Sequence, residues 1–388
     1  MNLYVFKGPK PPHPQTFSDG RFFKIDTLRE ALRRQPKLKV SILSDALRGT
    51  RETPNPSCAS LLAPLVSEFG AGRVEIRMYH TPNLRGLKKK IVPKRLNEGW
   101  GLQHMKLYGI DDEIVMSGYV VSQPISKFHT ASAHLDGSAN LSTDYFTNRQ
   151  DRYHIFSCPD LTSYFAGIHH AVCSISYNVL PGPKEQGGYT LEWPETNPAP
   201  MPTEEPKGFQ LAATSILTPL IRPKLPPTKP LSSASKTVVY PLAQFTPLLY
   251  PQDTSTEHPA LSSVLQLLSS DAFANSRWVF TAGYFNIHTR LKKLLLASKS
   301  VEGIVVTAAP EANGFYGSKG VSGMLPAAYT LMARQFLEDV IKTGKGDSIQ
   351  LKEWKKGAIG KDLDAWTYHA KGIHSYDPTR YVDKHLIR

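Results

Sequence analysis

The sequence of 388 residues predicts an α/β protein made of two similar halves. Predicted strands and helices alternate along the chain, which is typical of helices covering a largely parallel sheet. The order helix, strand, helix, strand, His-x-Lys occurs twice, so the halves form a faint internal repeat. Between them the composition changes to Pro, Gly, Glu, Thr and Ser with few apolar runs, which indicates a linker.

The first half, 27–180, is predicted from two kinds of hydrophobic spacing. Apolar residues at helical intervals indicate helices, and alternation of apolar and polar residues indicates strands. The elements expected here are the helix 27–34, the strand 39–45, the helix 60–69, the strand 74–79 and the helix 161–172. Residues 119–138 show no clear period, so we expect an atypical insertion inside this half.

The second half, 237–373, repeats the same order of elements and is expected to be truncated at its C-terminal end. The predicted elements are the helix 264–268, the strand 278–285, the helix 289–297, the strand 302–308, the helix 326–340 and the strand 349–354. Outside the two halves we expect a disordered or atypical N-terminus over 1–26, a Pro-rich linker over 181–236 and an atypical tail over 374–388.

The composition restricts the class of partner. The net charge is +13 and the pI is about 9.4. Such a balance favours an anionic partner, which can be a nucleic acid, an acidic membrane surface or a phosphorylated substrate. The three cysteines are scattered and odd in number, so reduced thiols are expected rather than zinc ligands or disulfides. No apolar run approaches the roughly 18 residues that span a bilayer, and we expect neither a signal peptide nor a presequence.

The chemistry predicted for the first half depends on His104, Lys106 and Asp111, which form the pattern H-x-K-x4-D. Alternate side chains of a strand share a face, so His104 and Lys106 should project together, with Met105 and Leu107 toward the core. An imidazole can attack a phosphate ester, and an ammonium group can hold the phosphoryl oxygens. The alternative for this pattern is a solvated strand face.

A second His-x-Lys, formed by His369 and Lys371, lies near the C-terminus, and Asn140 and Ser142 follow the first one. Two such units in one chain resemble the phospholipase D superfamily. The resemblance implies a phospholipase D-like duplicated α/β/α sandwich in which the two halves share one active site.

Six longer strings narrow the resemblance. They are HTPNLRGL at 80–87, GLQH at 101–104, STDYFTNRQDRY at 142–153, TAGYFN at 281–286, EANGFYGSKG at 311–320 and PAAY at 326–329. Together they resemble the eukaryotic mitochondrial phosphatidylglycerophosphate synthases. The resemblance implies a phosphatidyl transfer from CDP-diacylglycerol to sn-glycerol 3-phosphate, which yields phosphatidylglycerophosphate and CMP on the way to phosphatidylglycerol and cardiolipin. It implies no cofactor, and the sequence offers no metal site.

The same resemblance implies roles for the site residues. One histidine, for which we favour His104, attacks the phosphatidyl phosphorus and forms a phosphohistidine, while His369 protonates the leaving CMP and then deprotonates glycerol. Lys106 and Lys371 would stabilise the negative oxygens, and Asp111 would orient a histidine. Asn140 and Ser142 would line the phosphate pocket. Arg149 and Arg152 clamp an anion or, alternatively, form structural charge pairs.

The resemblance also implies a peripheral protein of the mitochondrial inner membrane, with no nucleic acid as partner. The basic run 87–90, continued by Lys94 and Arg95, is expected to bind an anionic membrane surface or a substrate phosphate. Its alternative is an ordinary solvated face.

Three features depart from the family pattern: the insertion 119–138, the sequence from 373 onward, and the shortened region before Lys39. Loss of the final strands would leave a sheet edge unpaired and His369 poorly supported. Two other functions therefore stay open. One is a phospholipase D-type phosphodiesterase or nuclease, and the other is a truncated, inactive homologue that binds membranes.

Overall fold

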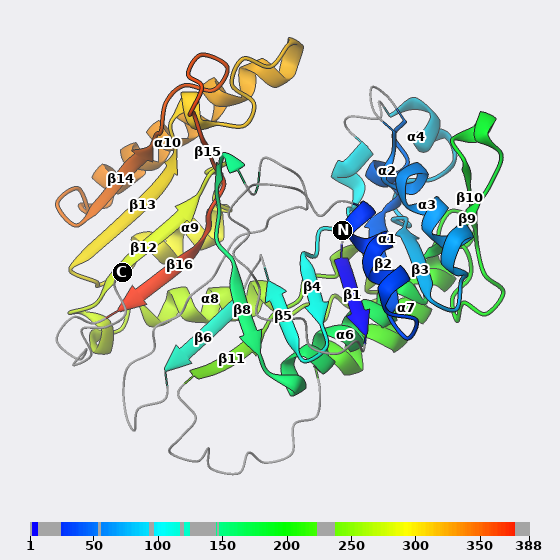
Figure 1. Cartoon of the computed structure of the whole chain (residues 1–388). Helices are drawn as coiled ribbons and strands as arrows, with labels where there is room; N and C mark the ends of the chain where they lie inside the picture. The colour runs from blue at the N-terminus through cyan, green and yellow to red at the C-terminus, as the bar shows by residue number, and fades with distance from the viewer. Residues whose placement is uncertain are drawn as a thin grey trace. The chain divides into compact units, whose positions relative to one another are not determined.

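The computed structural model describes residues 2–6, 25–52, 56–92, 97–116, 120–124, 145, 147–222 and 237–376. The chain forms two compact units (Figure 1). The first unit comprises Met1–Met116, His154–Lys224 and Gln244–Ser255, and the second comprises Ser117–Tyr153, Leu225–Ala243 and Thr256–Arg388. The units therefore differ from the predicted halves, because Ser117–Tyr153 belongs to the second unit and most of the expected linker to the first.

The first unit is built on one sheet with the strand order β10-β9-β3-β2-β1-β4-β5-β8. Its strands are β1 (Asn2–Phe6), β2 (Lys39–Asp45), β3 (Val74–Tyr79), β4 (Leu107–Ile110), β5 (Glu113–Met116), β8 (His154–Ser157), β9 (Tyr177–Pro181) and β10 (Tyr189–Glu192). Among the described strands, β2 pairs in parallel with β3 and β1 with β4, and the other neighbours are antiparallel. The expectation of a largely parallel sheet is thus wrong for this unit.

Helices cover both faces of this sheet (Figure 1). The helices of this unit are α1 (Ile25–Arg34), α2 (Ala46–Gly49), α3 (Cys58–Phe69), α4 (Gly86–Ile91), α6 (Pro159–Cys173) and α7 (Pro206–Ile221), with 3-10 turns η1 (Asn97–Trp100), η2 (Lys184–Gln186) and η3 (Thr246–Leu248). Leu32 of α1 and Leu65 of α3 pack with Ile42 and Ile76 of the sheet in one apolar core. Side chains of a strand alternate between faces, so Ser41 points to the opposite face, where it contacts α6.

Two segments expected to be irregular are ordered parts of this unit. Asn2–Phe6 forms β1 between β2 and β4, because five residues dominated by apolar and aromatic side chains suit a strand. Inside the expected linker, α7 packs against α6 and buries Phe209, Ala213 and Leu217 at helical spacing. The proline content of this region favoured a linker over a helix. One of these prolines lies in the first turn of α7, where proline is tolerated.

The second unit is built on the sheet β14-β13-β12-β16. Its strands are β12 (Arg277–Ala282), β13 (Glu302–Ala308), β14 (Ile349–Trp354) and β16 (Lys371–Tyr376). β12, β13 and β14 run in parallel as predicted, and β16 is antiparallel to β12. Two short sheets add β7 (Arg149–Gln150) beside β15 (Thr367–Tyr368) and β6 (Val120–Pro124) beside β11 (Thr237–Pro241).

Three helices pack on the larger sheet of this unit. They are α8 (Glu257–Leu267), α9 (Thr289–Leu296) and α10 (Leu325–Lys342), with 3-10 turns η4 (Asp271–Phe273), η5 (Pro310–Ala312) and η6 (Gly320–Met324). Trp278 and Phe285 form the core with Phe336 of α10, and the latter two rings meet edge to face. Among the helices of the described residues, none is both long and apolar enough to cross a membrane.

The C-terminal strand extends beyond the point where the family resemblance ends. β16 pairs with β12 from Lys371 to Tyr376, and Ile373 is buried in the core. The expectation that His369 would be poorly supported is therefore wrong. The backbone on both sides of His369 is held, by β15 before it and by β16 after it.

Candidate active site

His369 is held by a buried carboxylate. Its Nδ1 donates to Asp151 Oδ2 at 2.8 Å, and the Asp151 side chain is fully buried while that of His369 is 10% exposed. The other oxygen of Asp151 accepts the backbone N–H of Arg152 at 2.9 Å. With its proton on Nδ1, the imidazole keeps a lone pair on Nε2. Asp151 thus fixes both the orientation and the tautomer of His369.

A cation and a phenol also contact the imidazole, and Lys371 Nζ lies 3.0 Å from both ring nitrogens. This Nζ also donates to the His369 carbonyl at 3.1 Å. The Tyr145 hydroxyl is 3.4 Å from His369 Nε2. Burial lowers the pKa of Lys371 to about 8, with Asp151 opposing and Arg149 adding to the shift. Burial also lowers the pKa of His369, although its hydrogen bond to Asp151 opposes that shift.

Backbone pairing between β7 and β15 brings these residues together. The N–H of His369 donates to the Gln150 carbonyl at 2.8 Å, and that of Thr367 to the Asn148 carbonyl at 2.9 Å. Gly283 lets the strand end pass closely, because a Cβ there would lie 2.3 Å from the Tyr368 carbonyl oxygen. The polar stretch after Ser142 therefore holds the backbone of His369, the histidine of the second His-x-Lys.

The two arginines predicted to bind substrate have different surroundings. The Arg149 guanidinium lies 4.3 Å from the centre of the Tyr145 ring, and the Tyr145 ring meets His369 edge-on at 5.2 Å. Arg149 thus belongs to the surroundings of His369. Arg152 is directed to the imidazole of His374 instead, with Nη1 in contact with Nε2.

In the first unit, β4 begins only at Leu107, so His104 and Lys106 precede the strand. His104 is exposed, whereas Lys106 is 5% exposed and its ammonium donates to the His104 carbonyl at 2.7 Å. The sequence placed both residues within a strand, whereas the structure has them in the segment that leads into β4. Met105 is only half-buried and Leu107 is buried.

Asp45 anchors the segment that carries His104. Its Oδ2 accepts the N–H of Gln103 at 2.9 Å, and its Oδ1 caps α2 through the N–H groups of Leu47 and Arg48 at 2.9 and 3.0 Å. Burial raises the pKa of Asp45, and these hydrogen bonds oppose that rise. One carboxylate thus joins the end of β2, the start of α2 and the residue before His104.

A second anchor comes from the end of β3. Thr81 Oγ1 donates to the Trp100 carbonyl at 3.1 Å. Gly101 has a φ of 134°, and a Cβ at this position would lie 2.5 Å from Thr81 Oγ1. The neighbouring His80 is buried, which lowers its pKa to about 4, and its Nδ1 lies 2.8 Å from the Thr81 carbonyl oxygen. A glycine is required here for the chain to turn toward His104.

Asp111 lies at the opposite edge of the sheet from Asp45. In the sheet, Ile110 of β4 is level with Val5 of β1, which is level with Val40 near the start of β2. Asp45 is the last residue of β2 and therefore lies at the other edge. Asp111 occupies the two-residue turn between β4 and β5 with a φ of 51°, about 16 Å of extended chain beyond Lys106. The expected role of Asp111 in orienting His104 is therefore not supported, and a turn role accounts for it.

Asn140 and Ser142, expected to line the phosphate pocket, lie outside the described residues. Within the described ranges no group of three or more His, Cys, Asp or Glu side chains could hold a metal ion.

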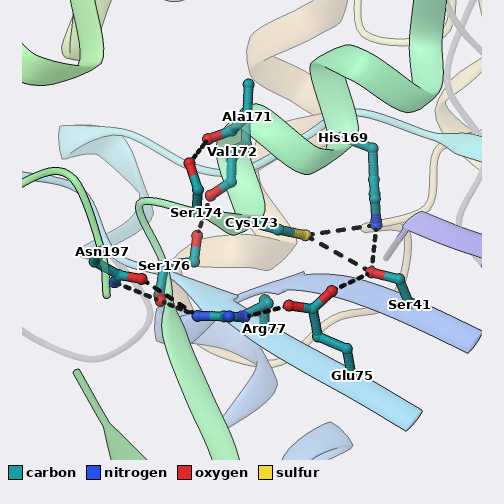
Figure 2. Close-up of polar contacts among 10 residues, drawn as sticks. All are labelled: Ser41, Glu75, Arg77, His169, Ala171, Val172, Cys173, Ser174, Ser176 and Asn197. Atoms are coloured by element: carbon teal, nitrogen blue, oxygen red, sulfur yellow. Dashed lines mark hydrogen bonds and ion pairs between the residues drawn. The ribbon is translucent and has the colours of Figure 1, made fainter. Parts of the chain in front are cut away.

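A further polar cluster lies between the first sheet and α6 (Figure 2). The hydroxyl of Ser41 contacts Glu75 Oε2 and His169 Nε2, both at 2.9 Å, and Cys173 Sγ lies 3.5 Å from the same nitrogen. His169 is fully buried, which lowers its pKa to about 3, and burial raises the pKa of Cys173. A neutral imidazole and a neutral thiol in this position hold α6 on the sheet.

The described residues also line a cavity of about 280 Å³ in the first unit. Its walls include Lys39 and Val74, the first residues of β2 and β3. His104 belongs to the other edge of this sheet, beyond the carboxyl ends of β2 and β3. The cavity is therefore separate from the candidate catalytic residues of this unit.

Sequence reasoning missed the two carboxylates that anchor the histidine segments. Asp151 is separated from Arg149 by one residue in a polar stretch, so alternation could have placed both on one face of a short strand. Asp45 ends a predicted strand and precedes a helical turn, which is a typical position for a capping aspartate.

No protein-family profile matches the chain. Its structure is similar to the crystal structure of a phosphatidylserine synthase from Haemophilus influenzae, with a TM-score of 0.56, 15% identity and coverage of 97% of this chain and 77% of the other. This likeness places the chain in a class of mixed α/β proteins with that fold.

Three relatives share more of the sequence. The CDP-diacylglycerol–glycerol-3-phosphate 3-phosphatidyltransferase of Saccharomyces cerevisiae is 43% identical over 353 residues, covering 90% of this chain and 63% of the relative. The enzyme of the same name from Schizosaccharomyces pombe is 39% identical, covering 90% and 70%. The human mitochondrial enzyme is 31% identical, covering 87% and 57%. The chain belongs to the family of CDP-diacylglycerol–glycerol-3-phosphate 3-phosphatidyltransferases, which confirms the resemblance found in the sequence. It spans 63% of the length of the Saccharomyces cerevisiae relative.

Proposed function

We propose that the chain transfers the phosphatidyl group of CDP-diacylglycerol to sn-glycerol 3-phosphate, giving phosphatidylglycerophosphate and CMP. Family membership supports this activity, because relatives at 39–43% identity carry it in their names. The structural observation that carries the proposal is the group Asp151, His369 and Lys371. A carboxylate-oriented imidazole beside an ammonium group is suited to attack on a phosphodiester or pyrophosphate.

The proposed reaction has two displacements at phosphorus. In the first, an imidazole nitrogen forms a P–N bond with the phosphatidyl phosphorus while the bond to the CMP oxygen breaks, and CMP leaves. In the second, the primary hydroxyl of glycerol 3-phosphate attacks that phosphorus, the P–N bond breaks, and the free histidine is restored. The other histidine protonates the leaving CMP and then accepts the hydroxyl proton, so the protons balance over one cycle.

His369 has the properties that a nucleophile needs. Its lowered pKa favours the neutral ring at pH 7, and the proton on Nδ1 leaves the lone pair on Nε2. We therefore propose His369 as the nucleophile and the exposed His104 as the acid and base, the reverse of the assignment favoured from the sequence. Lys371 and Lys106 would stabilise the phosphoryl oxygens, with Arg149 adding positive charge beside His369.

We also propose that both His-x-Lys sequences act on one phosphorus atom in a duplicated α/β/α sandwich of the phospholipase D type. Two observations support the duplication. Each unit contains parallel strands covered by helices, and each places a His-x-Lys at the start of a strand of its main sheet, since Lys106 directly precedes β4 and Lys371 is the first residue of β16. Asn140 and Ser142 would complete the phosphate pocket. The two-step reaction requires two imidazoles, which these sequences supply.

The proposed setting is the surface of the mitochondrial inner membrane, with anionic lipid as a partner. Mouse and human relatives are named as mitochondrial enzymes, and the net charge of +13 favours an anionic surface. The proposal uses no metal, cofactor or nucleic acid.

The test is release of CMP from CDP-diacylglycerol in detergent micelles, with and without glycerol 3-phosphate. We expect release to depend on glycerol 3-phosphate and to be lost in His369→Gln. The matched control is His258→Gln, which changes an exposed histidine of α8 in the same unit. Cleavage of DNA instead would favour the nuclease, and absence of turnover in the unchanged protein would favour the inactive homologue.

Rapid quenching tests the nucleophile. With CDP-diacylglycerol labelled at the phosphatidyl phosphorus and no glycerol 3-phosphate, we expect an acid-labile label on His369. His104→Gln should still become labelled but should transfer the label slowly. A label on His104 would restore the assignment made from the sequence.

A further inference from the structure

Helix α4 exposes an apolar pair that none of the described residues of the first unit covers. Leu87 is 70% exposed and Ile91 is 69% exposed, and no residue of α4 is buried. The two side chains are four residues apart, so they lie on one face of the helix. An exposed pair of large aliphatic side chains with no packing role in the described structure indicates an external contact.

Lysines surround this pair in a regular way. At about 100° per residue, Lys88 and Lys90 project about 80° to either side of the Leu87–Ile91 face, and Lys89 projects about 180° away. The position of Lys89 agrees with this geometry, because its charge contributes to the lowered pKa of buried His80 in the body of the unit. The outer face of α4 therefore presents two aliphatic side chains between two ammonium groups.

We infer that α4 docks on an anionic lipid bilayer, with Leu87 and Ile91 inserted at the boundary of headgroups and acyl chains and Lys88 and Lys90 on the lipid phosphates. This inference deepens the proposed function and rests on it for the choice of a lipid surface as the occupant.

Charge and size both favour a lipid surface over a protein. A six-residue helix is about 9 Å long, which is enough to insert two side chains but presents far less than the roughly 800 Å² that each partner buries in a stable protein interface. Lysines attract anionic headgroups, and their aliphatic stems can lie along the acyl boundary.

The position of α4 in the first unit relates the proposed membrane contact to the His104 segment. The helix follows β3, at the edge of the sheet where Thr81 and Asp45 hold the segment of Gly101 and His104. A lipid substrate keeps its acyl chains in the bilayer while its phosphates react, so the residues of this edge must approach the membrane surface. Docking through α4 would bring the His104 segment to that surface.

Co-sedimentation with vesicles that contain no CDP-diacylglycerol tests the inference. Vesicles are made of phosphatidylcholine alone or with about one third phosphatidylserine, an anionic lipid. We expect the double variant Leu87→Ser/Ile91→Ser to bind anionic vesicles about a hundredfold more weakly, about tenfold for each side chain. Lys88→Gln/Lys90→Gln should lose about fivefold for each charge on anionic vesicles and little on neutral ones.

Two matched controls lie in the same unit. Ile155 on β8 is 68% exposed, and β8 lies five strands from β3 in the sheet order, about 24 Å away. Ile155→Ser and Lys207→Gln, an exposed lysine of α7, should bind as the unchanged protein does. Thermal unfolding of every variant verifies the fold, which surface substitutions should change little.

The outcomes separate the inference from the proposed function. Unchanged vesicle binding in the α4 variants would overturn the inference, even if the unchanged protein transfers phosphatidyl groups in micelles. Weakened binding without any turnover in the unchanged protein would support the membrane contact and reject the transferase. A change of oligomeric state in the Leu87 and Ile91 variant, with vesicle binding intact, would show a contact between copies and overturn the lipid assignment.

Discussion

The Nδ1 of His369 lies 2.8 Å from Oδ2 of Asp151, although the two residues are 218 positions apart in the chain. The pair is buried, and the parallel backbone contact of β7 with β15 holds it in place. A carboxylate in this position keeps the imidazole in one tautomer and one orientation. The residue that supports the second His-x-Lys thus comes from the segment after the first.

We expect Asp151→Asn to lower the rate of phosphatidyl transfer about a hundredfold or more. The neutral amide holds the proton on Nδ1 less strongly than a carboxylate does, and its NH2 group can donate to Nδ1 instead, so the tautomer with a free Nε2 loses its stabilisation. Asp111→Asn is the comparison, because Asn tolerates the positive φ of that turn, and we expect its rate to change less than threefold. CMP release under saturating substrate measures both variants.

Thermal unfolding distinguishes a chemical effect from a folding defect in these variants. Both should unfold within a few degrees of the unchanged protein. Equal losses of activity in Asp111→Asn and Asp151→Asn would contradict the role derived from the structure and restore the assignment made from the sequence.

The pH dependence of the transfer rate should follow His369 and Lys371. Burial lowers the pKa of His369, so its neutral form persists below pH 6.5 and the acidic limb should lie below that value. Lys371 has a pKa of about 8, so its positive charge, and with it the rate, should decline as the pH rises through about 8. A profile of kcat/KM from pH 5 to pH 10 measures both limbs.

Lys371→Arg separates the two limbs, because a guanidinium keeps its charge across this range. The variant should be slower, since the arginine is larger, but its profile should lack the decline near pH 8. A basic limb that persists unchanged in Lys371→Arg would assign that titration to another group.

The sequence predicted most of the regular elements, because their signals are local. α10 and β13 were expected from periodicity within the segments themselves, and the structure confirms both. The relation of Asp151 to His369 could not be found in this way, because it depends on a strand of two residues paired across the chain. Local spacing instead favoured Asp111, which the sheet register places at the wrong edge for His104.

The predictions of irregular structure around β1 and α7 were wrong for a related reason. Composition suggested disorder near β1 and a linker across α7, but tertiary contacts decide both segments. β1 completes the sheet between two other strands, and α7 buries one face against α6. Proline and lysine content alone does not report such long-range contacts.

Gly101→Ala should disrupt the segment that leads to His104. Its φ of 134° suits glycine, and the new Cβ would lie 2.5 Å from Thr81 Oγ1, so the backbone or Thr81 must move. We expect a loss of stability of about 1–3 kcal/mol and a transfer rate reduced about tenfold or more through displacement of His104. Urea unfolding and CMP release measure the two effects.

Gly99→Ala is the matched control for this substitution. A Cβ at Gly99 meets no atom within 4 Å, so its stability should change by less than about 0.5 kcal/mol. Equal effects of the two alanines would show that Gly101 has no special conformational role.

Acid should destabilise the first unit through His169. The folded protein holds this imidazole neutral with a pKa of about 3, mainly through burial, whereas the unfolded chain titrates near 6.5. Between these values the unfolded state binds more protons, so the stabilisation present above pH 6.5 is lost as the pH falls toward 3. The slope contributed by one such proton is about 1.4 kcal/mol per pH unit.

His169→Gln tests this contribution, because glutamine can still contact Ser41 but carries no titrating group (Figure 2). We expect the variant to be less stable at pH 7 and to have a flatter dependence of unfolding free energy on pH between 6.5 and 4. The slope is measured by urea unfolding at several pH values, and an unchanged slope in His169→Gln would mean that other buried groups, such as His80 with its pKa of about 4, account for the acid sensitivity.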